Sequence, residues 1–332
     1  SITVDFEGHR VQLPEGAKIT ELTGRRSHPR GMPVAALLNR RLVSLERPLP
    51  DGAVVQVVTR DDPEGLRVVR RSTCLLLYEA FRRIAPKARV ISGQTFGPWY
   101  YFDVLDAEEP VADLVVRAQK EMERLRAEDL RFDVQRLPTD EAVARFALEG
   151  REDRQALLLT WWHESVRVVS AGGYLDIRHG QVVPSAGYLP PFALHPYAQG
   201  FVLGFAAGGP AAPDLAQAPP LMKGLLNIYQ ETKAWYRVLG VANVGDLNRV
   251  CTTNEYRHLI SVAEGFHEKK IAAIADRIAG CNGKTRLILV AGPSSSAWAA
   301  SVSPSCSTLR METFARLNTE RLPSNPASGP IR

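Results

Sequence analysis

The chain has 332 residues, and its 41 Lys and Arg against 36 Asp and Glu give a formal net charge of +5. This length allows two or three domains, and 45% hydrophobic with 23% charged residues is typical of a soluble globular protein. The basic excess is compatible with a nucleic-acid or nucleotide partner and equally with a solvated basic surface.

Cysteine spacing and hydropathy exclude several other classes of protein. The four cysteines are scattered and form no Cys-x-x-Cys pair, which argues against a zinc ribbon and against a disulfide framework. No apolar run is long enough to span a bilayer, so we expect no membrane partner. A reducing, cytoplasmic location is therefore favoured.

Residues 1–62 are predicted to form a small β-rich unit. Ile2, Val4 and Phe6 alternate as in a strand, and strands are also predicted at 34–39 and 53–59. A turn at 49–52 precedes the last of these strands. The pattern suits a compact β-grasp sheet.

Residues 64–205 are predicted to form a second, α+β unit. Helical periodicity covers 64–85, 111–130 and 140–149, and strand-like runs lie between and after them. The Gly-, Pro- and Ala-rich segment 206–220 is predicted to be a linker and a domain boundary.

Residues 221–296 are predicted to be helices at 221–239 and 255–279 followed by the start of a P-loop α/β domain. The run RLILVAGPSSS indicates a buried strand and the first part of a phosphate-binding loop, whose candidate nucleotide-binding residues are Gly292, Pro293, Ser294, Ser295 and Ser296. A P-loop then requires Gly-Lys-Ser/Thr, because the Lys reaches the outer phosphates and the hydroxyl binds Mg²⁺. Ala297, Trp298 and Ala299 occupy those positions. The Ser- and Pro-rich tail 297–332 is expected to be mostly disordered.

Three segments, in this order, resemble one family arrangement. ALLNRRLVSLERPLPDGAVVQVVT resembles a TGS domain, and RRSTCLLLYEAF, GPWYYFDV and YLDIRHGQVVPSAGYL resemble the editing domain of threonyl-tRNA synthetases. EYRHLISVAEGFHEKKIAAIADRIAG with RLILVAGPSSS resembles the entry into a uridine-kinase-like P-loop domain. Together they resemble nucleoside kinases with a synthetase-like N-terminal half, over about residues 1–296.

The resemblance implies ATP-dependent phosphorylation of a uridine-like nucleoside, with ATP and Mg²⁺ as cofactors. The missing Gly-Lys-Ser/Thr predicts that this chain is inactive in that reaction and binds neither cofactor productively, so we assign no catalytic residue and no metal site. A frameshift near Ser296 is one hypothesis for the departure from the family pattern. Two alternatives remain open, a non-enzymatic tRNA- or RNA-binding module and a truncation without a role. The oligomeric state is also open.

The resemblance to the editing domain also has departures. The family's His-x-x-x-His pair falls on Arg71 and Leu75, and its Cys-x-x-x-His pair falls on Arg178 and Val182. Arginine does not lose its proton in proteins, and Leu and Val carry no polar group, so editing chemistry is not expected. What remains is the domain's shape, with an Arg-lined cleft suited to anions.

Two aromatic segments each have two interpretations. Residues 99–102, WYYF, alternate along a strand, so two of the rings are expected to pack in the core and two to face out; a base-stacking platform is the alternative to packing. His163 follows Trp161 and Trp162, which form either an aromatic patch or, for at least one Trp, part of the core.

Overall fold

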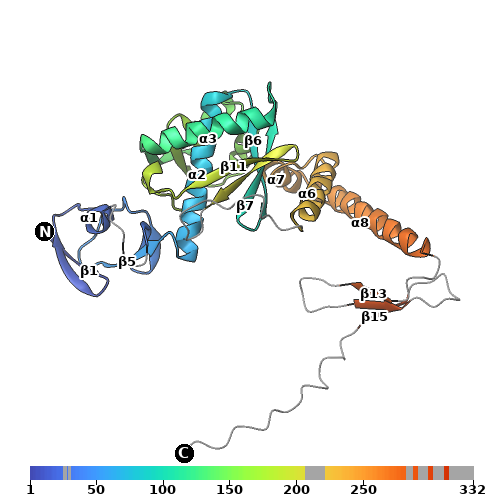
Figure 1. Cartoon of the computed structure of the whole chain (residues 1–332), viewed down its shortest axis with the longest axis horizontal. Helices are drawn as coiled ribbons and strands as arrows, with labels where there is room; N and C mark the ends of the chain where they lie inside the picture. Colours follow the sequence, from blue (N-terminus) through green and yellow to red (C-terminus); the bar gives the residue numbers. More distant parts are fainter. Residues whose placement is uncertain are drawn as a thin grey trace, which may run out of the picture. The chain divides into compact units, whose positions relative to one another are not determined.

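The computed structural model describes residues 1–24, 28, 31–205, 221–281, 287–290, 298–301 and 310–313. The chain divides into two compact units, Ser1–Thr252 and Thr253–Arg332 (Figure 1). The first unit is a mixed α+β structure with three sheets, and the second contains one long helix and a small antiparallel sheet. No helix within the described ranges is long and apolar enough to cross a membrane.

The N-terminal sheet is mixed, with strand order β2-β1-β5-β3-β4. Only the β1–β5 pair is parallel, because the chain runs through α1, β3 and β4 before β5 returns beside β1. Ile19 of α1 is fully buried and covers this sheet together with Val34 and Val55. The elements are β1 (Ile2–Phe6), β2 (His9–Leu13), α1 (Ile19–Thr23), β3 (Pro33–Leu38), β4 (Arg41–Val43) and β5 (Val54–Thr59).

Helix α2 (Pro63–Ile84) contacts all three sheets of the first unit. Its first turn packs on β5, and its last turns carry Tyr78 and Phe81 into the aromatic core. A helix that is buried on several sides must satisfy its polar side chains internally. Ser72 donates to the carbonyl of Val68 (2.8 Å) and accepts from the backbone N–H of Val183 (3.0 Å).

Glu79 of α2 is a fully buried carboxylate. It accepts hydrogen bonds from Arg82 and Arg83, both at 2.6 Å, and from the backbone N–H of Gly173 (3.3 Å). Burial by itself raises the pKa of Glu79, but these hydrogen bonds outweigh burial and leave the pKa below its usual value. Glu79 is therefore ionised at neutral pH and joins α2 to the turn at Gly173, between β9 (Ser165–Ala171) and β10 (Tyr174–Ile177).

The four-stranded sheet is antiparallel, with order β11-β12-β7-β6, and α3 lies across it beside α2. Phe201 of β12 stacks between Phe81 of α2 (5.4 Å between ring centroids) and Phe102 of β7 (5.3 Å). Such aromatic contacts contribute beyond simple area burial. The elements are β6 (Arg89–Phe96), β7 (Trp99–Leu105), α3 (Val111–Ala127), β11 (Phe192–Tyr197) and β12 (Gly200–Phe205).

The three-stranded sheet has order β10-β9-β8 and separates two parts of the core. Helix α2 packs against β9 and β10, while α4 and α5 cover the other face around Phe146 and Leu158. The elements are β8 (Phe132–Pro138), α4 (Thr139–Leu148), α5 (Glu152–Leu159), β9 (Ser165–Ala171) and β10 (Tyr174–Ile177), and the short 3₁₀ turn η1 (Ala186–Tyr188) follows.

Helices α6 (Leu221–Val238) and α7 (Val244–Thr252) complete the first unit, where α6 packs on β6 and α7 packs on α5. Leu226 of α6 joins a cluster with Trp99 and Tyr101 of β7, and Tyr229 donates to Asp103 (2.7 Å). A base-stacking role for residues 99–102 is therefore wrong: three of the four rings are buried, and α6 covers the Trp99–Tyr101 face.

The second unit contains α8 (Tyr256–Ala279) and an antiparallel sheet of order β13-β14-β15. None of the residues of α8 is buried. The strands are β13 (Leu287–Val290), β14 (Trp298–Ser301) and β15 (Arg310–Thr313). Two strands of the tail expected to be mostly disordered are thus paired, and the rest of that tail lies outside the described residues.

Gly65 allows the close approach of α2 to the N-terminal sheet. A Cβ at this position would lie 1.8 Å from the carbonyl oxygen of Thr59, which is backbone and cannot move aside. Gly224 of α6 is a matched control, because a Cβ there meets nothing within 4 Å.

We predict that Gly65→Ala lowers the free energy of unfolding by about 1–3 kcal/mol, as overpacking does. Gly224→Ala should leave it unchanged or raise it by up to about 1 kcal/mol, since Ala favours helix. Urea unfolding followed by circular dichroism measures both. Equal midpoints for the two variants would show that this contact does not limit the packing of α2.

Candidate functional site

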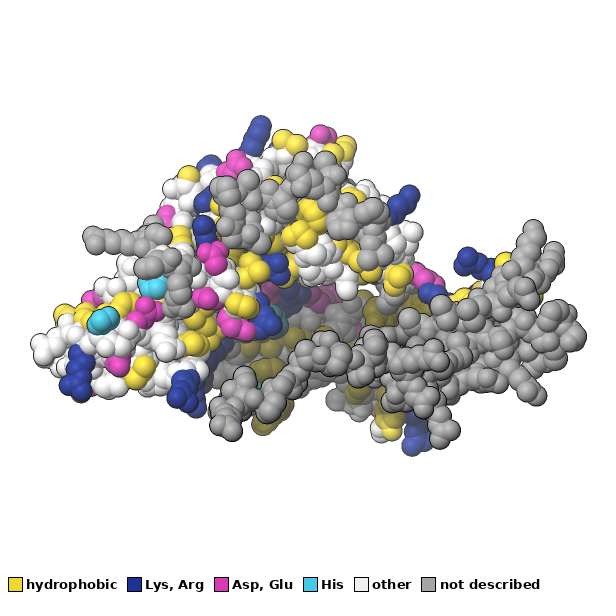
Figure 2. Space-filling view, turned by 60° about the horizontal axis from the view of Figure 1, so that its bottom comes forward, with side chains coloured by type: hydrophobic (Ala, Val, Ile, Leu, Met, Phe, Trp, Pro, Cys, Tyr) yellow, Lys and Arg dark blue, Asp and Glu magenta, His cyan; other side chains and the backbone are white. Residues whose placement is uncertain are grey.

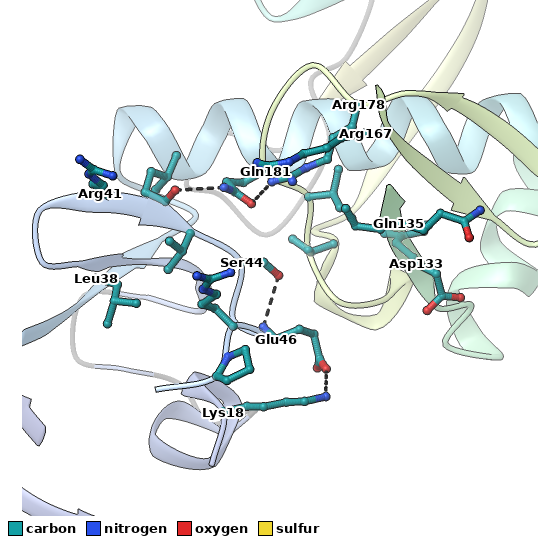
Figure 3. A pocket seen from close by; sticks show the side chains of 18 of the residues that line it. Lys18, Leu38, Arg41, Ser44, Glu46, Asp133, Gln135, Arg167, Arg178 and Gln181 are labelled. Carbon is teal, nitrogen blue, oxygen red and sulfur yellow. Dashed lines mark hydrogen bonds and ion pairs between the residues drawn. The ribbon is translucent and has the colours of Figure 1, made fainter. Parts of the chain in front are cut away.

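A cavity of about 1100 Å³ lies within the first unit, between the β3–β4 region and the three-stranded sheet (Figure 3). Its lining is strongly basic. The acidic lining residues are Glu46 and Asp133, and the basic ones are Lys18, Arg41, Arg47, Arg131, Arg136, Arg167 and Arg178. On the face drawn in Figure 2, by contrast, basic and acidic side chains are interspersed. Positive charge is thus concentrated in the cavity beyond what an even spread of the chain's net charge of +5 would give.

Three of these arginines form a row across the three-stranded sheet. Arg136 of β8 lies directly opposite Arg167 of β9. The backbone N–H of Arg178 donates to the carbonyl of Arg167 (2.9 Å), which continues the β9–β10 pairing by one residue. Directly opposed residues of antiparallel strands point to the same face, and like charges there destabilise the sheet. We call Arg136, Arg167 and Arg178 the arginine row.

The arginine row keeps most of its charge uncompensated. Among the described residues Arg136 and Arg167 form no ion pair, whereas Glu46 binds Lys18 at 2.7 Å and lies 3.8 Å from Arg131. Of the two acidic side chains in the lining, Glu46 is thus already engaged by cations outside the arginine row. A bound anion would supply the charge that the row lacks.

The half-buried Arg178 is held in place by its neighbours. It donates to the carbonyl of Gly180 (2.8 Å) and to the side chain of Gln181, and Figure 3 shows it beside Arg167. Burial, together with the charges of Arg167 and Arg71, lowers the pKa of the Arg178 guanidinium. Arginine starts from so high a value that Arg178 stays charged at neutral pH.

The loop of Gly180 and Gln181 also connects the site to α2 and to the N-terminal sheet. Arg71 donates to the carbonyl of Gln181 (2.7 Å), and the Gln181 side chain donates to the carbonyl of Leu42 on β4 (3.0 Å). Burial is the main cause that lowers the pKa of Arg71. These contacts fix both walls of the cavity through one loop.

The four positions of the editing-domain pattern are now located. Arg71 and Arg178 meet at the Gly180–Gln181 loop, whereas Leu75 and Val182 are buried core residues, 5% and 2% exposed. No side chain at these four positions can accept a proton at neutral pH. The sequence correctly indicated an Arg-lined cleft, but it did not identify Arg136 and Arg167. Their signal is an arginine inside a β-branched, alternating run, as in SVRVV.

The expected phosphate-binding residues, 292–296, lie outside the described residues, so the expectation that they bind no ATP or Mg²⁺ productively stays a prediction. The strand before them, β13, pairs antiparallel with β14. Within the described residues no group of three or more His, Cys, Asp or Glu side chains is placed to hold a metal ion.

The buried carboxylate Asp176 is structural. It accepts from Arg154 (3.0 Å) and from the Tyr174 hydroxyl (2.9 Å), and Arg151 lies 3.3 Å away. Burial favours the protonated form of Asp176, but these partners outweigh burial and lower its pKa. A carboxylate held ionised in this way is a poor proton donor at neutral pH.

Comparison with known proteins points to one class of enzyme. No protein-family model matches the chain. A threonine–tRNA ligase of Geobacter sp. (strain M21) is 30% identical over 192 residues, which cover 57% of this chain and 30% of that protein. The corresponding enzyme of Alkalilimnicola ehrlichii is 28% identical over 267 residues, 77% of this chain and 40% of that protein. That of Magnetococcus marinus is 32% identical over 161 residues, 48% of this chain and 25% of that protein.

The chain is thus related to tRNA ligases, and it contains a threonyl-tRNA-synthetase-like domain. It spans between a quarter and two fifths of the length of these curated relatives. The interpretation as a nucleoside kinase is wrong, because the relatives are threonine–tRNA ligases and nothing in the comparisons supports a kinase. The kinase interpretation rested on the helical run 255–280 and on a strand followed by Gly-Pro-Ser. The latter is a common strand-and-turn pattern, and it lacks the Lys that makes a P-loop specific.

The arginine row yields a stability prediction. Arg136→Gln should raise the free energy of unfolding by roughly 0.2–1 kcal/mol at low salt, because it removes one of two directly opposed like charges. The gain should shrink as salt screens the repulsion. Arg145→Gln is the control, because Arg145 pairs with Glu141 at 2.6 Å. This variant should lower the free energy of unfolding by up to about 0.5 kcal/mol. Urea unfolding at low and high ionic strength measures both, and a destabilised Arg136→Gln would contradict the prediction.

Proposed function

We propose that the chain is a non-catalytic RNA-binding module that holds tRNA-like RNA at the basic cavity. The observation that carries this proposal is the arginine row, whose three like charges are aligned on one sheet face where they oppose folding. Such an arrangement is useful where a polyanion binds. The relatives, which are tRNA ligases by name, support RNA as that polyanion.

The domain assignment forms part of the same proposal. Residues 1–62 form the TGS-like β-grasp domain, and residues 64–205 form the domain that resembles the synthetase editing domain. The mixed N-terminal sheet, with α1 packed on it, supports the first assignment. The meeting of Arg71 and Arg178 at one loop supports the second, because the family pattern expects its two pairs to face one pocket.

The size of the cavity favours a polymer over a single small anion. The cavity has a volume of about 1100 Å³. Its basic residues come from the N-terminal sheet region and from the three-stranded sheet, so they line opposite walls (Figure 3). One phosphate contacts two or three side chains, whereas a backbone with repeated phosphates can engage several cations along the walls. Each phosphate that is neutralised releases counterions, which makes binding tight at low salt and strongly salt-dependent.

We predict salt-dependent binding of tRNA by the purified chain. Arg167→Gln should weaken binding and lower the slope of log K against log salt by roughly 0.7–0.9, the value for one phosphate contact. Arg145→Gln, which changes the same residue type outside the cavity, should bind like the unchanged chain. Fluorescence anisotropy over a salt series gives both quantities. Binding that is absent, or equally affected by both variants, would overturn the proposal.

A second prediction concerns hydrolysis. The chain should not deacylate mischarged seryl-tRNA above background, because Arg71, Leu75, Arg178 and Val182 provide neither a general base nor a nucleophile. Release of radiolabelled serine measures the rate. Deacylation that is lost in a Gln181→Ala or His179→Ala variant would show that the site carries a chemistry that its residues do not reveal.

A further inference from the structure

A second, smaller cavity of about 400 Å³ adjoins the arginine row. Arg136, Arg167 and Arg178 line both cavities. The remaining lining of the smaller one is largely apolar and aromatic, with Leu157, Leu158, Trp161, His163, Ile177 and His179 among its residues. Of the four positions of the editing-domain pattern, Arg71, Leu75 and Val182 do not line it and Arg178 does, so it overlaps that pattern at one residue.

The aromatic side chains of Trp161 and His163 line this smaller cavity, and the Trp162 ring lies against His163. Trp161 is 39% exposed and Trp162 is 85% exposed, so neither is the core residue that the sequence allowed. The His163 ring lies 5.2 Å from the Trp161 ring and 3.9 Å from the Trp162 ring. The Trp161 indole N–H donates to the carbonyl of Ser165 (3.4 Å), which restrains the ring at the start of β9.

Two large indoles left in water at one place indicate a binding surface, because they expose apolar area that folding normally buries. The chemistry of the occupant follows from what surrounds them. A flat aromatic face beside a row of guanidinium groups fits a base joined to a phosphate, since every base can stack and every nucleotide carries the anion. An apolar peptide would satisfy the rings but not the three arginines.

We propose that Trp161, His163 and the arginine row form a subsite for one unpaired nucleotide of the bound RNA. The base stacks on the aromatic rings, and its phosphate lies at Arg136, Arg167 and Arg178. This inference rests on the proposed RNA binding and adds a preference for RNA that is unpaired at this point. A fully paired duplex keeps its bases stacked inside and cannot use the subsite.

The test compares two RNA ligands on the full chain. One is a blunt RNA duplex, and the other is the same duplex with a short unpaired overhang. Trp161→Ala should weaken binding of the overhang ligand by roughly tenfold to a hundredfold and leave the duplex affinity and its salt slope unchanged. Trp161→Phe should restore most of the loss, because it keeps an aromatic face. Leu159→Ala is the control, since Leu159 is 68% exposed nearby and lines neither cavity.

The outcomes separate this subsite from the proposed function. If Trp161→Ala weakens both ligands equally, or neither, the subsite is wrong while RNA binding at the arginine row stands. If no RNA binds to the unchanged chain, both proposals fail. Quenching of tryptophan fluorescence by an uncharged apolar peptide, but not by the overhang RNA, would assign the rings to a protein partner and overturn the subsite.

Discussion

The first unit depends on one helix that is surrounded by protein along most of its length. Helix α2 touches the N-terminal sheet at its start, the three-stranded sheet along its middle and the aromatic core at its end. A helix in this position cannot follow a simple amphipathic pattern, and it must satisfy its polar groups without water. Ser72 and Glu79 do so with partners more than ninety residues away in sequence, Val183 and Gly173. Both walls of the basic cavity therefore take their positions from α2 and from the loop that Arg71 binds.

Two groups of arginines in the first unit differ in their partners: one is paired with buried carboxylates, and the other has no carboxylate partner among the described residues. Arg82, Arg83 and Arg154 are matched to the buried carboxylates Glu79 and Asp176, each at hydrogen-bonding distance. Unpaired buried charges are too unfavourable to survive, so this matching is a condition of folding. The arginine row has no such partners among the described residues. The contrast separates charges that hold the structure together from charges that remain available for a ligand.

Local patterns in the sequence predicted most of the elements, but not their pairing into a site. Periodicity located α2, α3, α4, α6 and α8 to within a few residues, because their apolar positions repeat at helical spacing. It did not identify β8, whose residues are mostly exposed along an edge strand, or the five-residue α1. The arginine row depends on the register between β8 and β9, which places Arg136 opposite Arg167. This register cannot be read from the sequence of either strand alone. The kinase interpretation was the converse error: a short local pattern was taken as evidence for a whole domain.

The position of α6 matters for any study of the isolated domain. The low-complexity segment 206–220 looks in the sequence like the natural place to end a recombinant fragment. Such a fragment would lack Leu226 and Tyr229, and it would expose Trp99 and Tyr101 on a sheet face. Asp103 would also lose its contacts with Tyr229 and Lys233, both at 2.7 Å. A fragment extended to Thr252 keeps this face covered and is the better choice for a soluble sample.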